Sequence, residues 1–142
     1  MSYLFDTDAI SETLRKKPLQ DYIEWLRQVP REDQYTSTII IGELYKGAYR
    51  STKQKEILTQ IREKILPELT VLPFDVNTAK IYGQIYTELE KKGQIIAHPD
   101  LQIAATAIQH NLELVTGNIK HFARISRLAI NYILSDARKK QQ

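Results

Sequence analysis

The 142-residue sequence contains no cysteine, and it has only five glycines and five prolines. Without cysteine the chain can form no disulfide, no thiolate zinc site and no cysteine nucleophile, which suits a reducing compartment. No apolar run is long enough to cross a membrane, and an acid already stands at position 6, which argues against a signal peptide. We therefore expect a protein of the cytoplasm with no membrane segment.

Hydrophobic residues make up 42% of the chain and charged residues 26%, and the two classes are interspersed without a linker or repeat. This length and composition suit one folded domain, which would bury roughly 70% of its unfolded surface. The net charge of +3 is concentrated at the C-terminal end, where basic residues outnumber acids. Such a segment can bind nucleic acid, but a solvated tail is the more common case. We predict a single domain over residues 1–134 and a basic tail over residues 135–142.

Short apolar segments alternate with amphipathic patterns along the chain. Strands are expected near residues 3–5, 35–37, 70–73, 113–116 and 128–133. Helices are expected after Asp6 and over residues 18–28, 38–48, 53–66, 75–92 and 99–111. Strands that alternate with helices predict an α/β fold with a central, mostly parallel sheet of four to five short strands flanked by helices.

Three acids fall where a parallel sheet usually binds ligands, beyond the carboxyl ends of its strands. Asp6 follows the first strand, Glu43 lies on an otherwise apolar or bare helix face, and Asp100 stands in the first turn of a helix. Each also has a purely structural explanation. Asp6 and Asp100 can stabilise helix N-termini, and Glu43 can pair with Lys46 on the helix surface.

The turn formed by Thr116, Gly117 and Asn118 follows the fourth strand and places further polar groups at the same edge of the sheet. Gathered carboxylates repel one another unless they are protonated or bind a metal, and oxygen ligands suit Mg²⁺ or Mn²⁺. Such an ion binds phosphate oxygens and lowers the pKa of a bound water. Hydrolysis of a phosphodiester bond is the reaction that this set would serve. From spacing alone, this interpretation and separate structural roles for each residue carry equal weight.

Five segments of the chain match one known family in order and spacing. They are YLFDTDAIS at 3–11, IGELYKGA at 41–48, IYGQI at 81–85, DLQIAA at 100–105 and LVTGNIKHF at 114–122. With these segments the chain resembles the PIN-domain ribonucleases, and among them the VapC toxins of type II toxin–antitoxin modules. The resemblance implies a three-layer PIN fold and Mg²⁺-dependent endoribonuclease activity, with Mn²⁺ as a possible substitute. It also implies a homodimer that a VapB-type antitoxin neutralises.

The resemblance assigns roles to individual residues. Asp6, Glu43 and Asp100 match the metal-binding acids, and Asn118 matches the polar residue that closes the catalytic site. Thr116 lies beside it, and we expect Thr116 and His121 to contact RNA or phosphate.

The chain departs from the family pattern at one position. Many relatives have a fourth acid at the position of His121, and a histidine supplies no negative charge near neutral pH. That substitution argues against a second metal ion. Asp8, where many relatives have Asn, is a candidate for part of the missing charge.

Two other functions are compatible with the sequence. Asp6-Thr7-Asp8 resembles the start of the aspartyl-phosphate phosphatase motif of the haloacid-dehalogenase superfamily, but Ile10 stands where that motif needs a small hydroxyl residue. A PIN-like module that only binds RNA or protein is the second alternative. The intact set of acids argues against it, whereas His121 is compatible with it.

Overall fold

The computed structural model describes residues 1–141 of the chain, in which one parallel sheet forms the centre of the molecule. The strands are β1 (Tyr3–Phe5), β2 (Gln34–Ser37), β3 (Thr70–Leu72), β4 (Glu113–Val115) and β5 (Ile130–Asn131). Their order is β3-β2-β1-β4-β5, and every neighbouring pair is parallel. The order reverses at β1, so β1 and β4 enclose the crevice where such sheets bind ligands. The predicted α/β class and strand number are confirmed.

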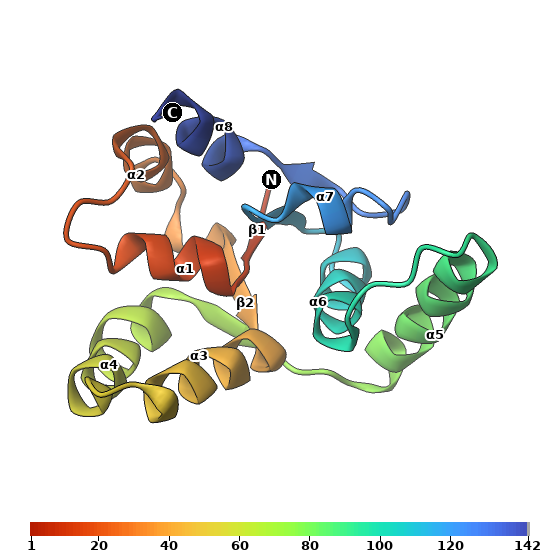
Figure 1. Cartoon of the computed structure of the whole chain (residues 1–142), viewed down its shortest axis with the longest axis horizontal. Helices are drawn as coiled ribbons and strands as arrows, with labels where there is room; N and C mark the ends of the chain where they lie inside the picture. The colour runs from red at the N-terminus through yellow and green to blue at the C-terminus, as the bar shows by residue number, and fades with distance from the viewer. Residues whose placement is uncertain (142) are drawn as a thin grey trace.

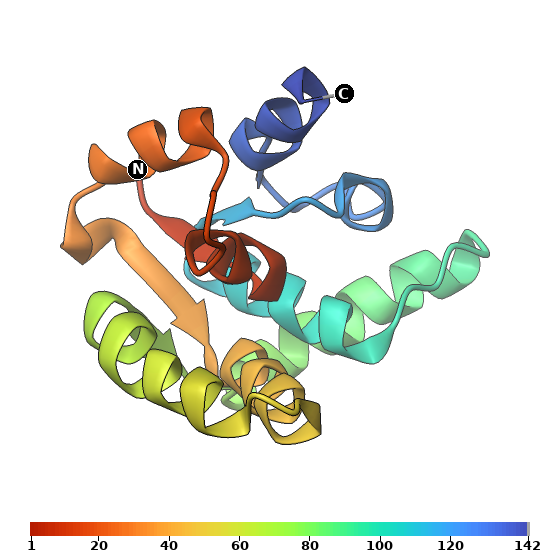
Figure 2. The same ribbon diagram turned by 60° about the vertical axis from the view of Figure 1, so that its left-hand side comes forward.

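Helices cover this sheet (Figures 1 and 2). They are α1 (Thr7–Thr13), α2 (Gln20–Arg27), α3 (Thr38–Arg50), α4 (Gln54–Gln60), α5 (Val76–Lys91), α6 (His98–Gln109), α7 (Ile119–Phe122) and α8 (Ile133–Lys140). Helices α5 and α6 lie side by side, and α5 extends to one end of the molecule (Figures 1 and 2). No helix within residues 1–141 is both long and apolar enough to span a membrane.

The sheet is buried on both faces. Leu4 and Phe5 are consecutive in β1, so their side chains point to opposite faces, and both are buried. Leu114 and Val115 repeat this arrangement in β4, where Leu114 pairs in register with Leu4. Each such side chain contributes about 1.5–3 kcal/mol through burial. Burial on two sides explains why the strands read as continuous apolar runs.

Local sequence signals fix where α5 and α6 begin and where α5 ends. Asp75 caps α5, as expected for the helix predicted over residues 75–92, and the structure adds a reciprocal capping box with Thr78. Gly93 follows the end of α5 with a φ of 65°, a conformation that costs glycine little. Pro99 lies in the first turn of α6, where its missing N–H leaves no helical bond unmade.

The C-terminal segment corrects the prediction of a solvated tail. Residues 133–140 form α8, whose buried side chains Leu134 and Ala137 are spaced one turn apart and which packs against α2. The predicted limit between residues 134 and 135 therefore falls inside a packed helix. The high density of basic residues in this segment conceals this small apolar face in the sequence. Residue 142 lies outside the described part of the chain.

Candidate active site

The carboxyl ends of β1 and β4 bring Asp6 and Thr116 to the crevice between these strands. The backbone N–H of Asp6 donates to the carbonyl oxygen of Val115 at 3.2 Å, which joins the two strand ends. Asp6 is also the N-cap of α1, because its Oδ1 accepts a hydrogen bond from the Ala9 amide at 2.9 Å. Its side chain is almost fully enclosed, with 6% of the residue exposed.

Burial raises the pKa of Asp6 to about 7. The charges of Asp8 and Asp100 contribute to this rise, whereas hydrogen bonds from the Thr116 hydroxyl and the Ala9 amide oppose it. The cause is the loss of water around the carboxylate, which disfavours its charged form. A buried acid with so high a pKa is typical of functional sites, where a cation or a proton balances the charge.

Asp100 lies in the first turn of α6, and we refer to the region around Asp6, Glu43 and Asp100 as the acidic pocket. Burial and the charge of Glu43 raise its pKa, and His121 lowers it. The Nδ1 atom of His121 lies 4.0 Å from Oδ2 of Asp100 and 3.1 Å from Nδ2 of Asn118. The backbone N–H of Asn118 in turn donates to Oγ1 of Thr116 at 3.0 Å. A short polar chain thus connects α6 with the turn after β4.

Glu43 extends from α3, which begins at the carboxyl end of β2. Its Oε1 accepts a hydrogen bond from the Thr7 hydroxyl at 2.8 Å. Thr7 and Glu43 also line a groove together with Gly47. A Cβ built at Gly47 would meet no other atom, so the groove is open at this point. The ion pair that the sequence offers as an alternative is not formed: no contact within 4.0 Å joins Glu43 to Lys46, both of which the structure describes. Glu43 therefore faces α1 and the acidic pocket.

The three predicted metal-binding acids act on one another electrostatically, because Asp100 raises the pKa of Asp6 and Glu43 raises that of Asp100. Within residues 1–141, however, no three Asp, Glu or His side chains already lie close enough together to enclose a metal ion. The donors are carboxylate oxygens, with hydroxyl and amide oxygens beside them, as hard divalent cations require. The residues therefore fit such an ion chemically, and ligation by Asp6, Glu43 and Asp100 stays a prediction.

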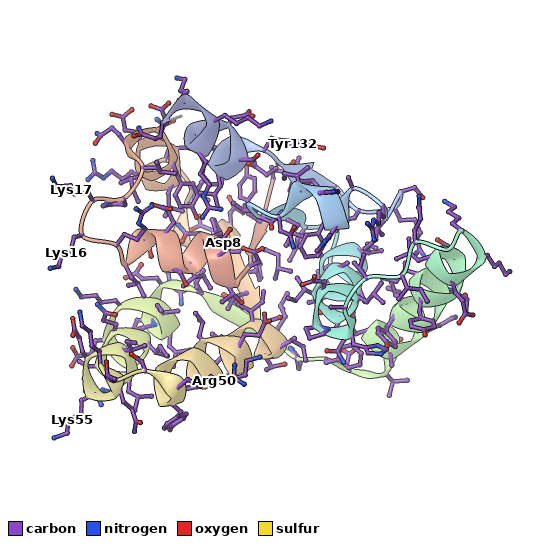
Figure 3. All side chains as sticks on the ribbon, viewed as in Figure 1. Asp8, Lys16, Lys17, Arg50, Lys55 and Tyr132 are labelled. Atoms are coloured by element: carbon purple, nitrogen blue, oxygen red, sulfur yellow. The ribbon has the colours of Figure 1, made fainter. Side chains whose placement is uncertain are left out.

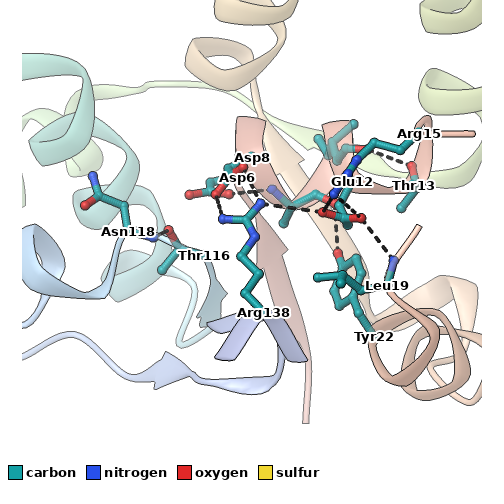
Figure 4. A network of polar contacts seen from close by, with 12 residues as sticks. Asp6, Asp8, Glu12, Thr13, Arg15, Leu19, Tyr22, Thr116, Asn118 and Arg138 are labelled. Carbon is teal, nitrogen blue, oxygen red and sulfur yellow. Dashed lines mark hydrogen bonds and ion pairs between the residues drawn. The ribbon is translucent and has the colours of Figure 1, made fainter. Parts of the chain in front are cut away.

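Sequence reasoning missed the ion pair between Asp8 and Arg138 (Figure 4). Nη1 of Arg138 lies 2.6 Å from Oδ2 of Asp8, and Nη2 lies 2.7 Å from Oδ1. Both oxygens of Asp8 are thus engaged, and its charge is balanced. Asp8 therefore does not supply the negative charge of the fourth acid, which many relatives have at the position of His121. Asp8 lies near the middle of the view in Figure 3, with its side chain 43% exposed, whereas Lys16, Lys17 and Lys55 extend outward at the edge of the molecule.

A second missed residue is Glu12, which is 1% exposed although the sequence offers no sign of its burial. Its carboxylate accepts hydrogen bonds from Nη1 of Arg15 at 3.2 Å and from the Leu19 amide at 3.1 Å. Arg138 adds a charged contact at 3.6 Å. A buried carboxylate is tolerated only with partners of this kind. Glu12 therefore acts as a structural anchor of α1.

The comparison with known protein families decides the identity of this fold. The family model for the PIN domain, which describes the sequences of that family, matches residues 3–128, most of this chain. The chain is a PIN-domain protein. This PIN domain is 39% identical to toxin FitB of Neisseria gonorrhoeae over 124 residues, covering 84% of this chain and 89% of FitB. It is 34% identical to ribonuclease VapC2 of Rickettsia felis over 131 residues, covering 92% of this chain and 96% of VapC2.

A solved structure confirms the likeness in three dimensions. The PIN domain superposes on a chain of the VapBC2 complex of Rickettsia felis, bound to a DNA fragment from its promoter, with a TM-score of 0.84. The two chains are 33% identical, and the match covers 92% of this chain and 98% of the other. This relationship confirms the predicted family and decides against the haloacid-dehalogenase alternative.

Proposed function

We propose that this PIN domain is the toxin of a type II toxin–antitoxin module and acts as a metal-dependent endoribonuclease. The buried carboxylate of Asp6 carries the proposal, because it lies at the switch point of the sheet within the field of Asp100. The names of the relatives, ribonuclease VapC2 and toxin FitB, support the same function. We also propose that the protein acts in the cytoplasm, where it would meet its RNA substrate.

Asp6, Asp100 and Glu43 are the residues that would hold Mg²⁺, or Mn²⁺ in its place. When bound, such an ion supplies a Lewis acid for the phosphate and lowers the pKa of a water. Burial of Asp6 excludes bulk water, which strengthens its attraction to a cation. With His121 in place of a fourth acid, we propose a single metal ion.

The remaining residues of the site orient these acids and the substrate. The Thr7 hydroxyl holds Glu43, and the Thr116 hydroxyl favours the charged form of Asp6. Asn118 and His121 are exposed at the rim and carry N–H donors for phosphate oxygens of RNA. Attack by water leaves a 5′-phosphate and a 3′-hydroxyl, whereas attack by the ribose 2′-hydroxyl would leave a cyclic phosphate.

The partner that we propose is a VapB-type antitoxin. The groove between α1, α3 and α4 is lined by apolar side chains such as Leu44 and Ile57 and by the carboxylate of Glu43. An amphipathic segment of the antitoxin fits such a groove. An arginine on that segment would bind the carboxylates of the toxin site in a bidentate manner. We also propose that the toxin forms a homodimer, which light scattering of the purified protein would test.

The decisive experiment is cleavage of a defined single-stranded RNA transcript with and without EDTA, followed by analysis of the product ends. We expect cleavage that EDTA abolishes and that Mg²⁺ or Mn²⁺ restores, with 5′-phosphate and 3′-hydroxyl ends. Cyclic ends, or activity that EDTA leaves unchanged, would refute the proposed chemistry. RNA binding without any cleavage would favour the non-catalytic alternative.

A further inference from the structure

Helix α8 brings an arginine from the C-terminal end of the chain to the edge of the acidic pocket. Leu134 and Ala137 anchor the helix in the core, and Lys140 pairs with Asp21 on α2 at 2.9 Å. Arg138 follows Ala137 directly, crosses to α1 and is only 35% exposed along its side chain. The buried residues Leu134 and Ala137 therefore fix the helix that carries Arg138, whereas the exposed Lys140–Asp21 pair contributes little to its position.

The guanidinium of Arg138 binds two carboxylates on one face of α1. It contacts both oxygens of Asp8, at 2.6 and 2.7 Å, and lies 3.6 Å from Oε1 of Glu12. Asp8 and Glu12 are four positions apart and so project from the same side of the helix. A bidentate ion pair fixes the orientation of the guanidinium relative to the carboxylate as well as the distance between them. Arg138 therefore determines where the first turn of α1, which Asp6 caps, lies relative to α8.

Gly117 shows that this ion pair also touches the turn after β4. A Cβ built at Gly117 would overlap Nη1 of Arg138 and Oδ2 of Asp8. Gly117 does not have a positive φ, so its backbone conformation does not require glycine. The requirement is one of space, because the Asp8–Arg138 pair packs directly against the backbone between Thr116 and Asn118.

We propose that Arg138 is a positioning residue of the active site. Its ion pair with Asp8 is the surface against which the turn of residues 116–118 packs, and it holds this turn beside Asp6. Asp6, Thr116 and Asn118 then keep their relative places because one rigid contact joins α1, β4 and α8. The inference rests on the proposed ribonuclease function, and it makes the C-terminal helix a part of the site.

Arg138 does not serve as a free phosphate contact in this arrangement. Asp8 engages both of its terminal nitrogens and balances its charge. A phosphate would have to displace a charge-assisted pair and approach Asp8, Glu12 and Asp6 at the same time. Arg138 therefore acts on RNA cleavage only by positioning other side chains, and its loss should alter kcat more than KM.

The first test needs neither metal nor RNA. The Asn118 amide donates to Thr116 within the turn, so its hydrogen exchange, measured by NMR, reports the order of that turn. We expect Arg138→Gln to accelerate this exchange by roughly tenfold or more. The matched control is Lys140→Gln, which removes the other ion pair of α8 and should leave the exchange unchanged. If the Asn118 amide of Arg138→Gln exchanges at the same rate as in the wild type, the proposal is overturned.

The second test measures kcat and KM on the RNA transcript. Arg138→Gln should lower kcat by roughly 100-fold and leave KM within about twofold, as expected for a misplaced catalytic group. Arg138→Lys should not restore kcat, because an ammonium cannot bridge both oxygens of Asp8. Lys140→Gln should cleave like the wild type. A parallel loss in both α8 variants, following the fraction unfolded in thermal melts, would reduce α8 to a structural role and refute the proposal.

Gly117 supplies an internal check by a double-mutant cycle. Gly117→Ala should lower kcat in the wild type because the methyl group displaces the ion pair. In an Asp8→Ala/Arg138→Ala background the space is open, so the same substitution should change kcat by no more than about twofold. Equal effects in both backgrounds would contradict the proposed contact. If the wild type fails to cleave RNA, the proposed ribonuclease function is refuted. The hydrogen-exchange experiment then decides by itself whether Arg138 orders the turn of residues 116–118.

Discussion

The hydroxyl of Thr7 donates a hydrogen bond to Oε1 of Glu43 across 2.8 Å, and so joins the first residue of α1 to the middle of α3. The two residues are 36 positions apart in the chain. Because Thr7 follows Asp6 directly, the bond also sets the distance between two of the predicted metal-binding acids. The acidic site thus depends on a neutral side chain that sequence reasoning did not single out.

Replacement of Thr7 tests this dependence. Thr7→Val keeps the shape of the side chain and removes its hydroxyl, so Glu43 loses its donor. A hydrogen bond to a charged group is worth about 1.5–3 kcal/mol, and we expect kcat/KM to fall by at least about tenfold. Thr7→Ser keeps the hydroxyl and should cleave within about threefold of the wild type. Equal activity in Thr7→Val and the wild type would show that Glu43 needs no such orientation.

Removal of single charges from the pocket should separate activity from stability. Asp6→Asn and Asp100→Asn should each abolish cleavage, because the amide supplies no charge for a cation. Their melting temperatures in EDTA should equal or exceed that of the wild type, since burial and like charges raise the pKa of both acids. Asp136→Asn, at an exposed acid of α8, is the matched control for both measurements. A large loss of stability would instead identify Asp6 or Asp100 as structural.

The raised pKa of Asp6 predicts a pH-dependent stability in the metal-free protein. The folded pKa of about 7 exceeds the ordinary value of 3.8, so the folded state binds the proton more tightly than the unfolded state does. The contribution of Asp6 is therefore fully present below about pH 4 and is lost as the pH rises to about 7. It is at most on the order of 4 kcal/mol.

Chemical denaturation in EDTA across this pH range measures that contribution. The difference in unfolding free energy between the wild type and Asp6→Asn should change steadily from pH 4 to 7, always to the disadvantage of the wild type. Asp100 shifts in the same direction, so Asp100→Asn should flatten the profile as well. Parallel profiles for the wild type and Asp6→Asn would contradict the raised pKa.

His121 is expected to limit the number of metal ions. Its Nδ1 lies 4.0 Å from Oδ2 of Asp100, so an acid at this position would face the pocket. His121→Asp should raise the Mn²⁺ stoichiometry, measured by isothermal titration calorimetry, from one ion toward two. His110→Asp adds the same charge at an exposed residue at the end of α6 and should bind one ion. Two ions bound by the wild type would refute the single-metal proposal.

Sequence reasoning reached the predicted acids because parallel strands share one carboxyl edge. Asp6 follows β1 and Thr116 follows β4, so the alternation of strands and helices places them on the same edge of the sheet. The strand order, which only the structure gives, brings them to one crevice. Glu43 stands out as a charge on an apolar helix face, and its hydrogen bond to Thr7 agrees with an inward direction. These features are local patterns repeated along a chain whose topology allows few arrangements.

The pairing of Asp8 with Arg138 left no such pattern. The residues are 130 positions apart, and each alone resembles an ordinary charged side chain on a helix. The basic residues around Arg138 suggest a solvated tail, and only Leu134 and Ala137 reveal the packed face of α8. Similarly, Glu12 acquires its burial from Arg15, Leu19 and α8 together.

By itself, the sequence determined the fold class, the starts of two helices near Asp75 and Pro99, and the three candidate acids. These depend on periodicity and on the chemistry of neighbouring residues, which lie within a few positions of one another. Tertiary structure alone decided the ion pair of Arg138, the space that Gly117 leaves for it and the raised pKa of Asp6. Each of these depends on how distant segments exclude water and meet one another, and a linear pattern of residues does not encode such distances directly.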